Sequence, residues 1–282
     1  MLVLKNFLNL GKQIGLYSKN KTGLIMKKIA TVILCGGLGT RLSEETELRP
    51  KPMVAIGGRP ILWHIMQHYS KYKFTNFTLA LGYKGEYIKD YFINYHARQS
   101  NLSVNLKTGV IDYTNLNSED WQVSLIETGG DTLTGGRLLR LKDHLKEEGT
   151  FMLTYGDGLS NVNIDELLSF HKKHGKICTV TAVKPSARFG GMEICEEAVT
   201  AFKEKPQSGE GSINGGFFVF NREIFDYLDD DQTILERSPM EKLVSDGQLM
   251  AFQHMGFWQC MDTIRDRDIL QKLWDEGSAP WI

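Results

Sequence analysis

Residues 29–52 read IATVILCGGLGTRLSEETELRPKP, and this stretch indicates both a fold class and a type of ligand. Its first six residues are apolar except for Thr31 and rich in β-branched side chains, which is typical of a buried strand. The glycines that follow, within residues 36–41, let a ligand approach the backbone and let several N–H groups converge on one anion. Arg41 and Lys51 add two cations, and the prolines beside Lys51 predict an extended backbone there. We therefore expect a polyanion at the carboxyl end of this strand.

The two best-known glycine-rich phosphate loops do not match this stretch. The dinucleotide-binding fingerprint Gly-x-Gly-x-x-Gly has glycine at its sixth position. Aligned with residues 37–42 of this chain, that position is Leu42. The phosphate loop of purine nucleoside triphosphatases requires Gly-Lys-Ser/Thr, a tripeptide that the chain lacks. A glycine-rich turn after a strand can also be no more than a tight connection. The combination of the loop with Arg41 and a lysine between two prolines makes the ligand-binding interpretation the stronger one.

Composition excludes several classes of protein. The chain has 282 residues and a formal net charge of −1 at pH 7, so nothing predicts a nucleic-acid or membrane-surface partner. No apolar run approaches the roughly 20 residues that cross a bilayer. The cysteines at 35, 178, 195 and 260 are far apart and show no paired metal-ligand spacing, which favours free thiols in a reducing compartment. We predict a cytoplasmic enzyme with a domain of α/β type.

The first 25 residues differ from the rest of the chain. They contain four lysines and no acidic residue, and their apolar residues lie near helical spacing. They lack the continuous apolar core and the cleavage site of a signal peptide. We interpret 1–25 as an N-terminal extension, either dispensable or serving as a docking or oligomer arm, and 26–282 as the catalytic domain.

Strand and helix patterns alternate along the domain. Strands are predicted at 77–81, 123–126, 151–155 and 178–183, and helices at 60–72, 84–95, 163–174 and 263–274. Such alternation predicts a doubly wound, mostly parallel sheet flanked by helices, with ligands at the carboxyl ends of the strands. Residues 103–121 are expected to form hairpins or a lid, and 191–194, 199–204 and 217–220 resemble strands.

Two carboxylates stand out in the later part of the chain. Asp157 lies between two glycines at the end of a predicted strand, where a ligand can reach it, although a plain turn aspartate would look the same. Asp262 precedes the last predicted helix, where the alternative is an N-cap. A second glycine-rich loop, residues 128–137, leads into another helix.

Further segments carry a resemblance to a known family. Residues 42–46, 134–137, 155–158, 204–206, 213–218 and 261–263, together with the first loop, resemble the sugar nucleotidyltransferase family. Within it they are most similar to the glucose-1-phosphate cytidylyltransferases, over about 26–282. The resemblance implies a Rossmann-like fold with a mixed sheet, a homo-oligomer, and Mg²⁺ as the cofactor. It also implies CTP and α-D-glucose 1-phosphate as substrates, with CDP-glucose made for the dideoxysugars of bacterial O-antigen and other surface polysaccharide.

The resemblance also implies roles for individual residues. Arg41 and Lys51 would act on the reacting phosphates, Asp157 and Asp262 would hold Mg²⁺, and a third set would bind the sugar phosphate: Glu204, Lys205 and Asn214. Arg41 and Lys51 would also contact the nucleotide. The other residues of the nucleotide-binding set would be Leu34, Gly36, Gly37, Leu38, Gly39, Thr40, Thr132, Arg137 and Gly156. Departures from the family pattern are Cys35, where alanine is common, and Arg49, where lysine often stands.

Three alternatives remain open at this point. UTP or dTTP could replace CTP, because side chains alone do not distinguish the pyrimidines. A catalytically silent nucleotide-sugar sensor could share the fold, although it would not need the two carboxylates. A dehydrogenase is disfavoured by the missing sixth glycine.

Overall fold

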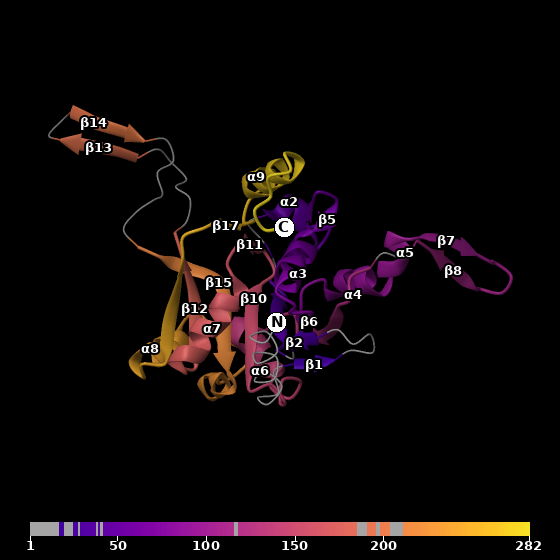
Figure 1. The fold of residues 1–282 in the computed structure, drawn as a ribbon, viewed down its shortest axis with the longest axis horizontal. Coiled ribbons are helices and arrows are strands. Elements are labelled where there is room, and N and C mark those ends of the chain that lie inside the picture. Colours follow the sequence, from indigo (N-terminus) through magenta and orange to yellow (C-terminus); the bar gives the residue numbers. More distant parts are fainter. Residues whose placement is uncertain are drawn as a thin grey trace, which may run out of the picture.

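A seven-stranded mixed sheet forms the centre of the molecule (Figure 1). The computed structural model describes residues 17–19, 25–27, 29–37, 39, 42–115, 118–184, 191–195, 198–203 and 211–282. The strand order is β16-β12-β15-β10-β3-β6-β9, in which β15 is antiparallel to both neighbours and the other neighbouring pairs are parallel. The bounds are β3 Thr31–Cys35, β6 Asn76–Leu81, β9 Gln122–Glu127, β10 Thr150–Tyr155, β12 Cys178–Val183, β15 Ile213–Asn221 and β16 Leu249–His254.

Helices and small two-stranded ribbons surround this sheet. The helices are α2 Ser43–Thr46, α3 Ile61–Lys71, α4 Gly85–Ile93, α5 Tyr95–Gln99, α6 Thr134–Arg140, α7 Ile164–His174, α8 Ser238–Ser245 and α9 Ile264–Asp275, with 3-10 turns η2 Lys51–Met53 and η3 Arg222–Tyr227. The ribbons pair β1 Tyr17–Lys19 with β2 Ile25–Lys27, β4 Ala55–Ile56 with β5 Arg59–Pro60, β7 Asn101–Val104 with β8 Ile111–Thr114, β11 Gly158–Ser160 with β17 Trp258–Cys260, and β13 Gly191–Cys195 with β14 Ala198–Lys203.

The sheet carries a hydrophobic core on each face. Successive side chains of a strand point to opposite faces, so Ile33 of β3 packs into one core and Val32 into the other. In β15, Phe217 and Phe218 divide in the same way. Helices α3 and α7 cover the first face, and α6, η3 and α8 contribute to the second. Burial on both faces explains why the strands read as continuous apolar runs, and it confirms the doubly wound α/β prediction.

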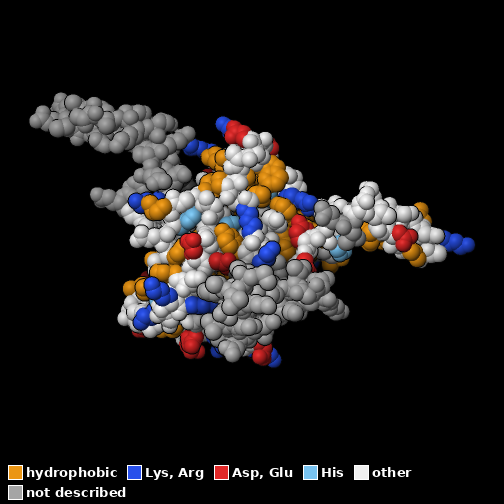
Figure 2. Space-filling view, viewed as in Figure 1, with side chains coloured by type: hydrophobic (Ala, Val, Ile, Leu, Met, Phe, Trp, Pro, Cys, Tyr) orange, Lys and Arg blue, Asp and Glu red, His pale blue; other side chains and the backbone are white. Residues whose placement is uncertain are grey.

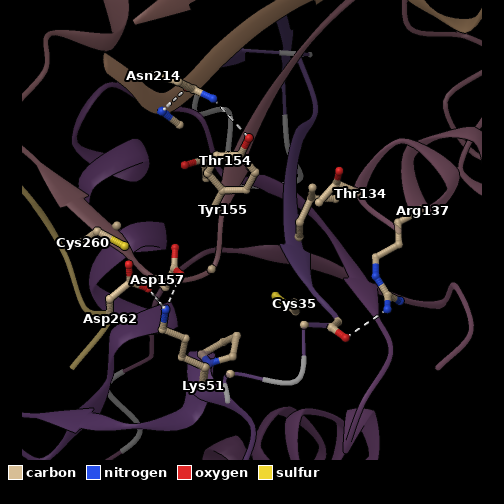
Figure 3. Close-up of a pocket in the computed structure, with 18 of the residues that line it drawn as sticks. Cys35, Lys51, Thr134, Arg137, Thr154, Tyr155, Asp157, Asn214, Cys260 and Asp262 are labelled. Carbon is tan, nitrogen blue, oxygen red and sulfur yellow. Dashed lines mark hydrogen bonds and ion pairs between the residues drawn. The ribbon is translucent and has the colours of Figure 1, made fainter. Parts of the chain in front are cut away.

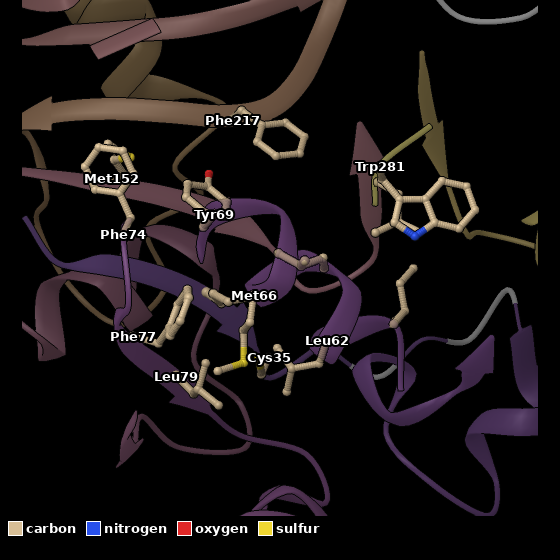
Figure 4. Packing of buried hydrophobic residues seen from close by; sticks show 14 of the residues in the cluster. Cys35, Leu62, Met66, Tyr69, Phe74, Phe77, Leu79, Met152, Phe217 and Trp281 are labelled. Atoms are coloured by element: carbon tan, nitrogen blue, oxygen red, sulfur yellow. The ribbon is translucent and has the colours of Figure 1, made fainter. Parts of the chain in front are cut away.

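The first core is closed by a residue from the far end of the sequence. Trp281 is fully buried (Figure 4), and its indole N–H donates to Nδ1 of His64 at 3.2 Å. The other ring nitrogen of His64 contacts the carbonyl oxygen of Ile56 at 2.8 Å, where it donates because Nδ1 accepts. Burial lowers the pKa of His64 to about 4. His64 is therefore a neutral structural residue.

Some local predictions were wrong. The helix predicted at 84–95 is present as α4 Gly85–Ile93, and a break at Asn94 separates it from α5. Lys51 is not extended but starts the 3-10 turn η2, in which Pro52 is tolerated because a first turn needs no N–H donor there. Strand β16 was not predicted.

The hairpin of β7 and β8 projects from the body of the molecule, as expected for part of residues 103–121 (Figure 2). Several of its apolar side chains are exposed, Leu106 most of all at 93%. Within the described part of the chain, every helix is too short or too polar to cross a bilayer.

Candidate active site

The carboxyl ends of β3 and β10 open into a cleft of about 510 Å³ (Figure 3). Every predicted site residue that the structure describes lines this cleft: Leu34, Gly36, Gly37, Gly39, Lys51, Thr132, Arg137, Gly156, Asp157, Asn214 and Asp262. Leu38, Thr40, Arg41, Glu204 and Lys205 lie outside the described residues. The structure thus brings together residues that are up to 228 positions apart, from Leu34 to Asp262.

A lysine held between two carboxylates marks one end of the cleft. Nζ of Lys51 lies 2.7 Å from Oδ2 of Asp157 and 2.6 Å from Oδ1 of Asp262 (Figure 3). The lysine side chain is 12% exposed, and the two carboxylates 24% and 21%. Burial alone would lower the pKa of Lys51, but the charge of Asp157 and hydrogen bonds to both carboxylates outweigh it and raise that pKa. The ammonium therefore stays charged at neutral pH.

The pairing of two short strands explains why these carboxylates meet. β11 and β17 are antiparallel, with Gly158 opposite Cys260, and the N–H of Met261 donates to the carbonyl of Asp157 at 2.9 Å. Asp262 then stands just before α9. That helix is capped by Thr263 and Asp266, whose side chains bond reciprocally to the backbone, so the N-cap alternative for Asp262 does not hold.

The donor set suits a hard divalent cation. Among the described residues, Asp157, Cys260 and Asp262 form the one group of three potential ligands, with ligand atoms all within 4.8 Å of one another. Mg²⁺ takes carboxylate, phosphate and water oxygens and is usually held by one or two carboxylates. Burial, followed by the charge of Asp157, raises the pKa of Cys260, so its thiol remains protonated and is a poor ligand for Mg²⁺. The two aspartates are therefore suitable ligands for Mg²⁺, whereas Cys260 only lines the cleft beside them.

The glycines of the first loop serve different purposes. A Cβ on Gly37 would meet no atom of the described residues within 4 Å. A Cβ on Gly36 would lie 2.2 Å from the guanidinium carbon of Arg137, and one on Gly156 would lie 2.8 Å from Pro52. The expectation of close ligand approach therefore applies to Gly37, whereas Gly36 admits Arg137 and Gly156 admits the turn that carries Lys51.

Arg137 joins the two glycine-rich loops. Its side chain is 4% exposed. Its guanidinium donates to the carbonyl oxygen of Gly36 at 2.9 Å and to that of Gly129 at 2.6 Å. Further bonds reach the backbone oxygens of Leu81 and Gly130. A guanidinium has only donors, so this cage of carbonyls satisfies it without an anion.

The second loop is held by a segment near residue 231. The N–H of Leu133 donates to the carbonyl of Asp231, and the carboxylate of Asp231 pairs with Arg140. Gly136 packs directly on this segment, since a Cβ there would lie 2.3 Å from the carbonyl oxygen of Asp231. Glycine at 136 thus allows helix α6 to begin beside the cleft.

The opposite wall contains residues that were not predicted. Tyr155 ends β10, and its ring packs on Gly216, whose φ is +77°. The amide of Asn214 donates to the Tyr155 hydroxyl at 3.3 Å (Figure 3). That hydroxyl in turn donates to Glu236. Trp258, which donates to the carbonyl oxygen of Gly215, also lines this wall, and Thr134 lines the cleft on the other side, at the start of α6. Because Tyr155 directly precedes Gly156 and Asp157, the sequence could have indicated that it lies at the site. The sequence around Glu236 contains no comparable motif.

Comparison with known proteins also indicates a nucleotidyl transferase. The nucleotidyl transferase family model matches residues 30–263. A glucose-1-phosphate cytidylyltransferase of Salmonella typhimurium is 48% identical over 89% of this chain and 97% of its own length. A probable glucose-1-phosphate cytidylyltransferase of Bacillus subtilis is 45% identical over 89% and 98%.

Solved structures support the fold at lower identity. HddC from Yersinia pseudotuberculosis superimposes with a TM-score of 0.65 at 23% identity, covering 87% of this chain and 99% of that one. A UDP-glucose pyrophosphorylase complexed with UDP-glucose gives a TM-score of 0.62 at 16% identity, covering 88% and 99%.

Proposed function

The chain belongs to the glucose-1-phosphate cytidylyltransferases of the nucleotidyl transferase family, and on that premise we propose that it transfers a cytidylyl group from CTP to α-D-glucose 1-phosphate. A phosphate oxygen of the sugar phosphate attacks the α-phosphorus of CTP. The bond to the leaving pyrophosphate breaks in the same step, and CDP-glucose is formed.

The observation that carries this proposal is the charge arrangement at the end of the cleft. One ammonium lies between two carboxylates, and Gly37 lines the same cleft. An incoming triphosphate offers oxygens that can take the ammonium of Lys51 away from the carboxylates. Those carboxylates then become available to Mg²⁺, which neutralises phosphate charge when it is bound. A cation fixed near the α-phosphate is most useful as charge develops in the transition state.

The side chains of the cleft favour direct displacement over a covalent enzyme intermediate. No histidine is among the described residues that line it, so its threonine hydroxyls have no imidazole base. Burial raises the pKa of the thiols of Cys35 and Cys260, which leaves both in the protonated, weakly nucleophilic form. The phosphate of the sugar substrate is already an anion and needs no base.

The remaining residue roles belong to the same proposal. Lys51, together with Arg41, acts on the reacting phosphates, and the first loop with Thr132 and Arg137 surrounds the nucleotide. Asn214 lies at the sugar end of the cleft, where Glu204 and Lys205 would hold the sugar phosphate. The cage around Arg137 favours an indirect contribution from this residue, through the carbonyls that it orients.

The cellular setting is part of the proposal as well. We propose that the protein is a cytoplasmic homo-oligomer and that its product enters bacterial surface polysaccharide. Residues 26–282 would form the catalytic domain, and the extension 1–25 would not be needed for turnover. Exposed apolar residues on the β7–β8 hairpin, Leu102, Val104 and Leu106 among them, support contact with another copy (Figure 2).

A substrate panel tests the reaction directly. Pyrophosphate release is measured with CTP, UTP, dTTP, ATP and GTP, each with glucose 1-phosphate and with other sugar 1-phosphates. We expect CTP with glucose 1-phosphate to give the highest kcat/KM. A preference for UTP or dTTP would change the proposed donor, and turnover with no pair would favour a nucleotide-sugar sensor.

A further inference from the structure

Glu236 lies just outside the cleft but is bonded to residues of both of its walls. One carboxylate oxygen accepts from the hydroxyl of Thr134 at 2.7 Å, and the other accepts from the hydroxyl of Tyr155. Thr134 begins α6, at the nucleotide loop, and Tyr155 ends β10, on the wall that holds Asn214. The one carboxylate therefore connects the two walls of the cleft.

A carboxylate fixes the direction of every hydrogen bond around it. It can only accept, so the hydroxyl protons of both Thr134 and Tyr155 must point toward Glu236. The oxygen of Thr134 is then free to accept, and it does so from the N–H of Leu235 at 3.0 Å. The oxygen of Tyr155 likewise accepts from Nδ2 of Asn214 at 3.3 Å.

The amide of Asn214 is constrained at both ends as a result. Its Oδ1 accepts from the backbone N–H of Gly216 at 2.8 Å, while one N–H of Nδ2 goes to Tyr155. The second N–H of Nδ2 remains to face a ligand, because Asn214 lines the cleft. The side chain thus offers a donor to the ligand and keeps its acceptor on the backbone.

We propose that Glu236 is a positioning residue for the sugar end of the cleft: it orients the hydroxyl of Tyr155 so that Asn214 presents an N–H to a hydroxyl of the bound hexose. The inference rests on the proposed function, which places glucose at this wall. An amide at 236 could itself donate to the Tyr155 oxygen. The tyrosine would then donate to Asn214, which would have to turn its Oδ1 away from Gly216 to accept.

Binding measurements test this inference without turnover. The dissociation constants of CDP-glucose and CTP are measured by calorimetry for the wild type, Glu236→Gln, Tyr155→Phe and the double variant. We expect Glu236→Gln to weaken CDP-glucose binding about tenfold, the scale of one misdirected hydrogen bond. CTP, which has no hexose, should bind within about twofold of the wild type. The double variant should bind CDP-glucose no more weakly than Tyr155→Phe alone, because the effect passes through that hydroxyl.

A control variant separates positioning from stability. Asp229→Asn breaks the exposed ion pair with Lys242 in the same segment but leaves the Glu236 bonds in place. It should leave both dissociation constants unchanged. Equal weakening of both ligands by Glu236→Gln, unchanged CDP-glucose binding, or additive losses in the double variant would overturn the inference. A wild type that binds CDP-glucose without turnover would overturn the proposed function alone, and one that does not bind it would overturn both.

Discussion

Replacing Lys51 by methionine removes the charge between the two carboxylates and keeps much of the side-chain volume. Lys51 contacts both Asp157 and Asp262 within 2.7 Å, so the variant leaves two partly buried anions facing each other. We expect opposite effects on two properties: turnover falls, whereas the affinity of the free protein for Mg²⁺ rises.

The cost in stability follows from the burial of the three side chains. Removing one partner of a fully buried ion pair typically costs about 3–5 kcal/mol. The Lys51 cluster retains 12–24% exposure, which allows water to screen the remaining carboxylates, so we expect about 2–4 kcal/mol for Lys51→Met without metal. Turnover should fall about 100- to 1,000-fold, the scale for losing one preorganised electrostatic contact, with the loss mainly in kcat.

The expected gain in metal affinity has the same origin. In the wild type the ammonium of Lys51 occupies carboxylate oxygens that Mg²⁺ would use, and Lys51→Met removes that ammonium. At a Mg²⁺ concentration about 100 times the dissociation constant, binding stabilises the folded state by about 2.7 kcal/mol. For a chain of this size that corresponds to a rise in Tm of about 5 °C. The wild type without nucleotide should respond much less.

Thermal unfolding with and without Mg²⁺, together with pyrophosphate release, measures both effects. Lys89→Met is the matched control, because Lys89 pairs with one half-exposed carboxylate, that of Glu127, at the surface. It should change neither turnover nor the response to Mg²⁺. Turnover of Lys51→Met within about tenfold of the wild type would refute the catalytic role of Lys51. The absence of a larger Mg²⁺ response would refute the competition between ammonium and metal.

Three further predictions concern the metal, the loop and two histidines. Asp157→Asn should lower turnover at least about a hundredfold, and EDTA should abolish turnover of the wild type; activity that persists in EDTA would remove the metal from the mechanism. Gly37→Ala should fold normally but raise KM for CTP, whereas Gly36→Ala should lower Tm because its Cβ would collide with a buried guanidinium; equal Tm values for the two variants would contradict this. Burial lowers the pKa values of His64 and His68 to about 4 from 6.5, so the unfolded state binds more protons between these values, and stability should fall as pH drops from 6.5 to 4. Over two and a half pH units at about 1.4 kcal/mol per unit, each histidine accounts for about 3–4 kcal/mol, measurable by urea unfolding at a series of pH values.

The central strands could be predicted because their sequences report burial on both faces. β12 Cys178–Val183 matches its predicted range, and β10 Thr150–Tyr155 begins one residue earlier than predicted. β16 Leu249–His254 escaped prediction because it is a half-exposed edge strand whose apolar residues follow no strong period. Its position depends on pairing with β12, which is a tertiary property.

Local motifs identified Lys51, Asp157 and Asp262, but not their mutual contact. That contact depends on the register of β11 against β17 and on the turn that carries Lys51, neither of which has a local sequence signature. For Arg137, in contrast, the contacts in the structure differ from the predicted role. The family resemblance implied a nucleotide contact for Arg137, whereas its bonds to backbone carbonyls depend on three separate strand and loop ends. Direct contact of Arg137 with the nucleotide stays a prediction.

The separation of the three charged residues along the chain has a consequence for biosynthesis. Lys51 lies 106 positions from Asp157 and 211 from Asp262, and a nascent chain emerges from its N-terminus onward. The glycine-rich loop therefore leaves the ribosome long before the last carboxylate exists. Contacts between such distant positions are also slow to form in a refolding chain. Partly made or partly refolded molecules should contain the strand and its loop without the charge cluster, so catalysis begins only when the most distant parts of the polypeptide have met.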